Sequence, residues 1–216
     1  MKVSVGATWR GRPSGAAGLA SVYSFNGNKI VTTSGGGALL TDDAGIAARA
    51  RKRSQQSREP FPWYQHEEVG YNYRMSNILA SVGLAQLDKL PRILERRART
   101  AARYAARCRT LPPVEGENHW LTVALSDGPA GRDALLKRFE ADGIEARPVW
   151  KPMHLQPVFS KCRVYGGKTA AELFARGVCL PSGTGLTPAD MRRVFAAMDA
   201  AGLSSAGGSR DPRDRV

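Results

Sequence analysis

Residues 20–41 read ASVYSFNGNKIVTTSGGGALLT, and this stretch decides the fold. A short apolar and aromatic run, residues 20–25, enters a tight turn at Asn26-Gly27-Asn28, directly before Lys29. Such a run followed by Asn and Gly is typical of a strand that feeds a turn. Three glycines, residues 35–37, precede residues 38–41, which predict a second buried strand after a flexible hinge.

A lysine on a tight turn after a buried strand can lose hydration, so that the pKa of its amine falls. Imine chemistry requires such an amine. Ser24 precedes Lys29 by five residues, and its hydroxyl could donate to a phosphate in the same pocket. The glycines at 35–37 would let backbone approach a bulky ligand closely. From the spacing alone, the commoner interpretation of Lys29 is an idle lysine in an exposed turn.

Helical signals follow this region. Asp42 or Asp43 can cap a first helix, and a polar loop with two prolines and several aromatic residues comes after it. Ser76 predicts the cap of an amphipathic helix, and Pro91 marks a bend or a second helix start. The predicted inner stripe of the Ser76 helix consists of Ile78, Leu79, Val82, Ala85 and Leu87.

The pattern changes after Pro112-Pro113 to short strands that alternate with helices, so we place a domain boundary after residue 110. Strands are expected at 120–125 and 144–149, with a helix between them that ends at Asp142-Gly143. Two capping boxes, Thr169 with Glu172 and Thr187 with Asp190, predict two further helix starts. We expect domains at 1–110 and 111–203, and a disordered tail at 204–216, which is nearly free of apolar residues.

Composition narrows the class of protein. The chain has 42% hydrophobic residues, no apolar run long enough for a bilayer and no secretion signal at its start, which predicts a cytoplasmic globular protein without a membrane partner. Its three cysteines are widely spaced, so we expect reduced thiols and no metal site. The net charge of +13 includes an arginine stripe, predicted to be solvated: Arg96, Arg99, Arg103 and Arg107. Without a zinc-finger, RNA-recognition or helix-turn-helix pattern, this charge does not favour nucleic acid as the partner.

Four blocks carry a resemblance to a known family. The run GATWRGRPSGAAGLASVYSFNGNKIVTTSGGGALLTDD, residues 6–43, resembles the Schiff-base region of the DegT-like (DegT/DnrJ type) sugar aminotransferases, which are fold type I enzymes dependent on pyridoxal 5'-phosphate (PLP). GYNYRMSNILASVGLAQLDKL, residues 70–90, resembles the family's dimer-interface segment. ARPVWKPMHLQPVF, residues 146–159, and CLPSGTGLT, residues 179–187, resemble its small domain.

The resemblance implies an α/β fold: the C-terminal part of a fold type I PLP-dependent transferase, with a remnant of the large-domain sheet and a smaller α+β domain. It also implies roles for single residues. Lys29 matches the lysine that binds PLP as a Schiff base and later shuttles a proton, and Ser24 matches a ligand of the cofactor phosphate. Asn72 matches an asparagine that reaches the phosphate across a homodimer with shared active sites. Arg74 and His154 lie in blocks near the site and are candidate substrate ligands. A turn cap, an interface ion pair and a structural histidine are the respective alternatives for Asn72, Arg74 and His154.

The block at 146–159 is most similar to the branch that aminates nucleotide-linked 4-keto-6-deoxy sugars, with glutamate as the usual amino-acid donor. The start Met1-Lys2-Val3 does not reproduce the family segment that carries the aspartate for the pyridine nitrogen. We therefore expect a chain truncated at its N-terminus. A non-catalytic remnant or interaction subunit of the same fold, and a basic nucleic-acid-binding protein, remain alternatives.

Overall fold

The computed structural model describes residues 2–3 and 5–203. The predicted disordered tail, residues 204–216, lies outside the described residues. Two compact units make up the chain: unit 1 is Met1–Leu94 with Val114–Asn118, and unit 2 is Glu95–Pro113 with His119–Val216. The predicted domain boundary after residue 110 stays a prediction, because compactness alone does not define an independently folding domain.

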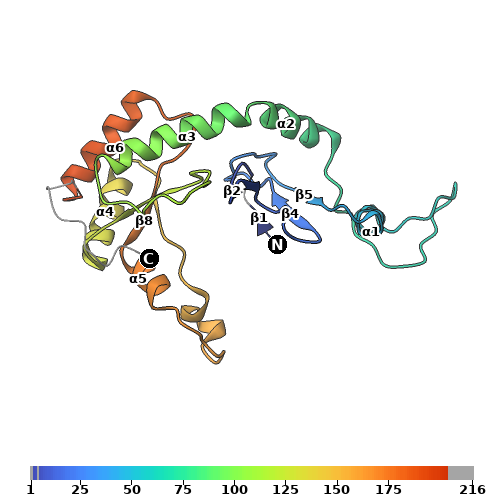
Figure 1. Ribbon diagram of the computed structural model, residues 1–216. Coiled ribbons are helices and arrows are strands. Elements are labelled where there is room, and N and C mark those ends of the chain that lie inside the picture. The colour runs from blue at the N-terminus through green and yellow to red at the C-terminus, as the bar shows by residue number, and fades with distance from the viewer. Residues whose placement is uncertain (1, 4, 204–216) are drawn as a thin grey trace. The chain divides into compact units, whose positions relative to one another are not determined.

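Unit 1 is built around a small mixed sheet in the strand order β1-β4-β5 (Figure 1). Strand β4 is central: it runs parallel to β1 and antiparallel to β5, with Ser24 paired to Gly37. A separate antiparallel pair joins β2 and β3. The strands are β1 Lys2–Val3, β2 Thr8–Trp9, β3 Arg12–Pro13, β4 Ser21–Ser24 and β5 Gly37–Leu40.

The strand–turn–strand prediction for residues 20–41 is confirmed in its element order, but the predicted burial of the second strand is wrong. Leu39 and Leu40 of β5 are 44% and 50% exposed. Strand β5 pairs only with β4 among the described residues, so it forms an edge of the sheet, and apolar side chains on both of its faces stay partly exposed.

Three helices follow in unit 1: α1 Ala44–Ser54, α2 Asn77–Asp88 and the first turn of α3 Leu90–Ala105. The side chain of Asp43 accepts the N–H of Ile46, and that of Ser76 accepts the N–H of Leu79, which confirms both predicted caps. Pro91 lies in the first turn of α3, directly after the end of α2, as the second-start prediction requires.

The predicted inner stripe of α2 is wrong for the described residues. Ile78 is 73% exposed and Val82 is 45% exposed, whereas the one buried residue of the helix is Gly83. A Cβ at Gly83 would lie 3.0 Å from Thr33 Cγ2, so the absence of a side chain allows α2 to approach the loop after Lys29. Hydrophobic periodicity identified a face that favours burial, but burial needs a covering element as well.

Unit 2 is a two-layer α+β structure with an antiparallel sheet in the order β6-β8-β7. The central strand β8 is buried along its whole length, and helices cover the sheet. The remaining elements are β6 Thr122–Leu125, α4 Pro129–Ala141, β7 Arg147–Pro148, the 3-10 turns η1 Met153–Leu155 and η2 Pro157–Phe159, α5 Lys168–Arg176, β8 Gly177–Leu180 and α6 Pro188–Ala200.

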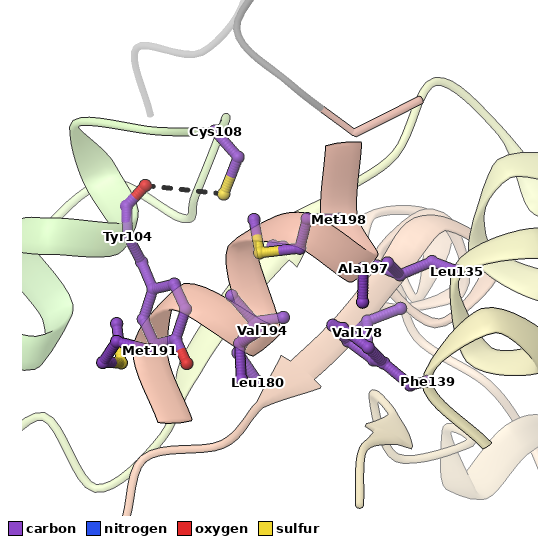
Figure 2. Close-up of a cluster of buried hydrophobic side chains, with 11 residues drawn as sticks. Tyr104, Cys108, Leu135, Phe139, Val178, Leu180, Met191, Val194, Ala197 and Met198 are labelled. Atoms are coloured by element: carbon purple, nitrogen blue, oxygen red, sulfur yellow. Dashed lines mark hydrogen bonds between the residues drawn. The ribbon is translucent and has the colours of Figure 1, made fainter. Parts of the chain in front are cut away.

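The hydrophobic core of unit 2 joins α3, α4, α6 and the sheet, as Figure 2 shows. Tyr104 of α3 is fully buried, and its hydroxyl donates to Pro181 O at 2.8 Å. The Tyr104 ring meets Phe195 of α6 edge-on, with ring centroids 5.8 Å apart. Leu135 and Phe139 of α4 are further large side chains that are fully buried there.

Local signals in unit 2 gave mixed outcomes. Thr187 and Asp190 form the predicted capping box at the start of α6. The Thr169 capping box is wrong: Gly167, with φ +96°, is the N-cap of α5, and Thr169 lies inside the helix. The strand predicted at 144–149 is shorter in the structure, where β7 spans Arg147–Pro148.

The arginine stripe lies on the surface, as predicted. All four of its arginines are exposed. The three cysteines are free thiols, of which Cys108 and Cys179 are buried and Cys162 is exposed. Within the described part of the chain, every helix is too short or too polar to span a lipid bilayer.

Candidate functional site

The candidate site begins where β4 ends at Ser24. The next residues form a closed loop: Phe25 N donates to Gly36 O at 3.0 Å, and Thr33 N donates to Phe25 O at 2.9 Å. Inside it, Lys29 N donates to Asn26 O at 3.0 Å and closes the tight turn that the sequence predicts. The backbone therefore holds residues 25–36 as a compact loop at the end of the central strand.

Lys29 lies at the border between solvent and the interior of unit 1. Its predecessor Asn28 is exposed, Lys29 itself is half-buried, and the following Ile30 and Val31 are buried. Thr33, also buried, contacts α2 at Gly83. The buried apolar residues after Lys29 thus anchor the loop that carries it, and its Schiff-base role stays a prediction. The lowered pKa expected for Lys29 stays a prediction.

Ser24 is half-buried, and its Oγ accepts the N–H of Asn26 at 3.4 Å. A hydroxyl that accepts one bond keeps its own hydrogen, which it can donate to an anionic oxygen. Ser24 and Lys29 thus belong to the same strand end and turn. This pairing of a hydroxyl donor with a primary amine was predicted from their spacing.

The glycines at 35–37 have a different structural role from the one predicted. A Cβ at Gly37 would lie 2.3 Å from Tyr23 O, so β4 and β5 can pair only with glycine there. At Gly36, with φ +84°, the neighbour is the Met75 side chain. Gly35 has open space around it, so close approach to a ligand stays a prediction at that position.

Asn72 and Arg74 lie together on the loop between α1 and α2, and both side chains are exposed. Asn72 pairs with Gln55 through an isolated antiparallel bridge. Arg74 N donates to Ser54 O at 3.1 Å, at the last residue of α1. The backbone around both residues is therefore fixed by hydrogen bonds, whereas their side chains are exposed.

His154 belongs to unit 2, in the 3-10 turn η1, and is half-buried. Its imidazole packs against Gly167 at the start of α5: a Cβ there would lie 2.8 Å from His154 Cε1. This close packing is consistent with the alternative of a structural histidine. The role of His154 in binding the substrate stays a prediction.

One set of side chains at the loop was missed at the sequence level. Lys52 and Arg53 near the end of α1 form ion pairs with Glu59 and Glu68 in the following loop. The acidic and basic residues were visible in the sequence, but only the path of the loop brings them together. These pairs hold the segment that carries Asn72.

A family model described as the DegT/DnrJ/EryC1/StrS aminotransferase family matches residues 3–199. The chain belongs to this family. Its members are PLP-dependent sugar aminotransferases, and this membership confirms the resemblance and the cofactor class. The chain accordingly carries part of the fold type I architecture, with the mixed α/β sheet of unit 1 and the α+β unit 2.

Similar proteins include EpsN of Bacillus subtilis, described as a pyridoxal phosphate-dependent aminotransferase, which is 41% identical over 89% of this chain and 53% of its own length. GDP-perosamine synthase of Caulobacter vibrioides is 39% identical over 91% of this chain and 56% of that protein. The solved structure of DesI in the presence of its TDP-sugar product superposes with a TM-score of 0.75 and 30% identity, over 92% of this chain and 53% of DesI. The chain therefore spans about half the length of the relatives it matches.

The residues present at the turn fit PLP in their chemistry. An aldehyde needs a primary amine, which Lys29 supplies, and a phosphate needs hydrogen-bond donors, which Ser24 Oγ can supply. Ser24 ends β4 and Lys29 lies on the hydrogen-bonded turn after it, an arrangement that suits a ligand held at two points.

Proposed function

We propose that the chain is the C-terminal part of a PLP-dependent aminotransferase that transfers an amino group from glutamate to a nucleotide-linked keto-deoxy sugar. The main support is the half-buried Lys29 on the turn after β4, with Ser24 at the strand end. The Caulobacter relative is named for a GDP-linked sugar and DesI for a TDP-linked one, which supports the nucleotide-sugar class without selecting the nucleotide.

In this proposal, Lys29 has two successive roles. PLP, when bound, supplies an aldehyde for the amino group and a ring that withdraws electrons. The Nζ of Lys29 would hold the cofactor covalently and, once released from it, would carry a proton to and from the substrate carbon. The buried Ile30 and Val31 anchor the loop that carries Lys29, which supports both roles.

Ser24 and Asn72 would hold the phosphate from two sides. Ser24 Oγ donates from the same chain as Lys29, while Asn72 reaches the phosphate of a second copy, so that two chains share each site. Support for a homodimer comes from the exposed apolar side chains of α2, among them Ile78 and Val82. An exposed helix face of this kind marks an interaction surface.

Two further residues are proposed to contact the substrate. The exposed Arg74 and the half-buried His154 are candidates for the sugar or its diphosphate, and the net charge of +13 suits an anionic substrate. The predicted cytoplasmic location also stays a prediction.

The proposed function is tested by following one half of the transamination, the transfer of an amino group from a donor amino acid to bound PLP, with the full chain. The purified protein is incubated with PLP and freed of excess cofactor, and then mixed with glutamate, aspartate or glutamine while the absorbance of the bound cofactor is followed. Conversion to the pyridoxamine form with glutamate supports the proposal, and a nucleotide-linked keto sugar should reverse it. Lys29→Ala should abolish conversion, and Lys161→Ala, at an exposed lysine of unit 2, should not. A chain that takes up no PLP but co-purifies with a full-length aminotransferase would support the interaction-subunit alternative instead.

A further inference from the structure

Residues 55–74, the greater part of the loop between α1 and α2, fold back onto the end of α1 and are called the arm (Figure 1). Its backbone is ordered by hydrogen bonds to the last turn of the helix. Tyr71 N donates to Arg53 O at 2.7 Å, and Tyr73 N donates to Ser54 O at 3.0 Å. The part of the arm that leaves α1 is called the outgoing limb, and the part that leads to α2 is called the returning limb. The two limbs are also joined directly, since Gln56 N donates to Tyr71 O at 2.9 Å.

The limbs touch where Ser57 meets Gly70. Ser57 is fully buried, its N–H donates to Lys52 O at 3.0 Å, and its hydroxyl donates to Val69 O at 3.4 Å. A Cβ at Gly70 would lie 2.3 Å from Ser57 N, so only glycine allows this contact. The base of the arm is thus closely packed.

The arm has little apolar burial to stabilise it. Ser57 is its one fully buried side chain, whereas its aromatic side chains are exposed at 40% or more: Phe61, Trp63, Tyr64, Tyr71 and Tyr73. A loop of this length without a core of its own needs polar interactions to stay in one conformation.

Lys52 supplies those interactions. Its Nζ lies 2.6 Å from Glu59 Oε1 on the outgoing limb and 3.7 Å from Glu68 Oε1 on the returning limb. Arg53 adds a second contact to Glu68, at 3.2 Å. The side chain of Glu59 is only 13% exposed, so its carboxylate depends on Lys52 for compensation. The hydrogen bond to Glu59 raises the pKa of Lys52 above its usual value, and the amine is charged at neutral pH.

We propose that Lys52 is a positioning residue that fastens both limbs of the arm to α1 and thereby fixes the segment that presents Asn72 and Arg74. The inference rests on the proposed function, in which Asn72 contacts the cofactor phosphate of a second copy. The contacts of the Lys52 amine that carry this role are those with Glu59 and Glu68. Lys52 acts through the backbone path of the arm, which carries Asn72 two residues beyond the contact at Gly70.

The fastening of both limbs by Lys52, called the clamp below, is tested without cofactor, by hydrogen exchange of the full chain. Lys52→Met leaves Glu59 unpaired, and the amides of Gln56, Tyr71 and Tyr73 should exchange about tenfold faster, the effect of losing roughly one charge-assisted hydrogen bond. Lys52→Arg keeps the charge and should stay near wild type. In the double variant Lys52→Met/Glu59→Gln, no buried charge is left uncompensated, so part of the protection should return. Lys161→Met is the matched control. Unchanged exchange in Lys52→Met overturns the clamp.

The positioning role is tested by the dissociation constant of PLP for the same variants. Lys52→Met and Asn72→Ala should each weaken PLP binding several-fold. The variant that combines these two changes should bind no more weakly than the worse single variant, because both changes remove the same contact, that of Asn72 with the cofactor phosphate. Additive losses, or wild-type affinity in Lys52→Met despite fast exchange, overturn the positioning role and leave the proposed function intact. A wild-type chain that takes up no PLP overturns the proposed function itself, whereas the clamp is still judged by exchange.

Discussion

Tyr104 connects three elements of unit 2, and its hydroxyl can be removed without changing the shape of the core. The O–H donates to Pro181 O at 2.8 Å in a fully buried position, so Tyr104→Phe removes one hydrogen bond and leaves a buried carbonyl unpaired. The expected loss in the free energy of unfolding is about 1–2 kcal/mol. Tyr104→Ala also removes the ring that meets Phe195 edge-on, and we expect a loss of about 3–5 kcal/mol.

The assay is hydrogen exchange of the β6 and β8 amides of the full chain at increasing urea concentrations, which reports unfolding of unit 2 alone. Tyr165→Phe is the matched control: Tyr165 is 81% exposed, and its change should stay within about 0.5 kcal/mol. The reasoning is refuted if Tyr104→Phe unfolds like wild type, or if Tyr104→Ala costs no more than Tyr104→Phe.

Three further outcomes are expected. Cys162 is exposed and should react with a maleimide in the folded chain. Burial raises the pKa of Cys108 to about 11 and should protect that thiol until urea unfolds unit 2. Equal labelling rates of the two thiols, measured by mass spectrometry, would contradict this. Gly37→Ala should clash with Tyr23 O and destabilise the β4–β5 pair by about 1–3 kcal/mol, seen as faster exchange in both strands and excluded if exchange is unchanged. Hydrogen bonds from Thr187 lower the pKa of Asp190 from its ordinary value of 3.8. The charged carboxylate therefore stabilises the fold above pH 3.8, and this contribution is lost as the pH falls through the lowered pKa. In urea titrations, the difference in the free energy of unfolding between wild type and Asp190→Asn should be smaller at pH 3 than at pH 5.

Local signals in the sequence predicted the beginnings of helices well where a side chain could reach its own backbone. Asp43, Ser76 and Thr187 each accept an N–H in the first turn, because capping depends on residues three apart. Thr169 failed because Gly167 adopts a left-handed conformation and begins the helix two residues earlier. The spacing of Thr169 and Glu172 carries no information on the backbone conformation of Gly167, which sets the start of the helix.

Burial was predicted less well than element type. The apolar stripe of α2 and the strand β5 have the expected composition, yet Ile78 and Leu40 are exposed in the described chain. A pattern shows which face favours burial, but it does not identify the element that covers it.

The turn with Ser24 and Lys29 was predictable because its residues are close in sequence. The clamp at Lys52 was not, because Glu59 and Glu68 reach it through a loop whose path depends on Ser57 and Gly70. Contacts through an irregular loop have no period that a sequence pattern could reveal.

The central claim is that the amine of Lys29 forms the covalent bond to PLP. The direct measurement is borohydride reduction of the PLP-treated full chain, followed by digestion and peptide mass analysis. We expect one pyridoxyl group on the peptide that contains residue 29 and none elsewhere, with the label lost in Lys29→Arg. Label spread over several exposed lysines, or a peptide with unmodified Lys29 beside bound cofactor, would contradict the account.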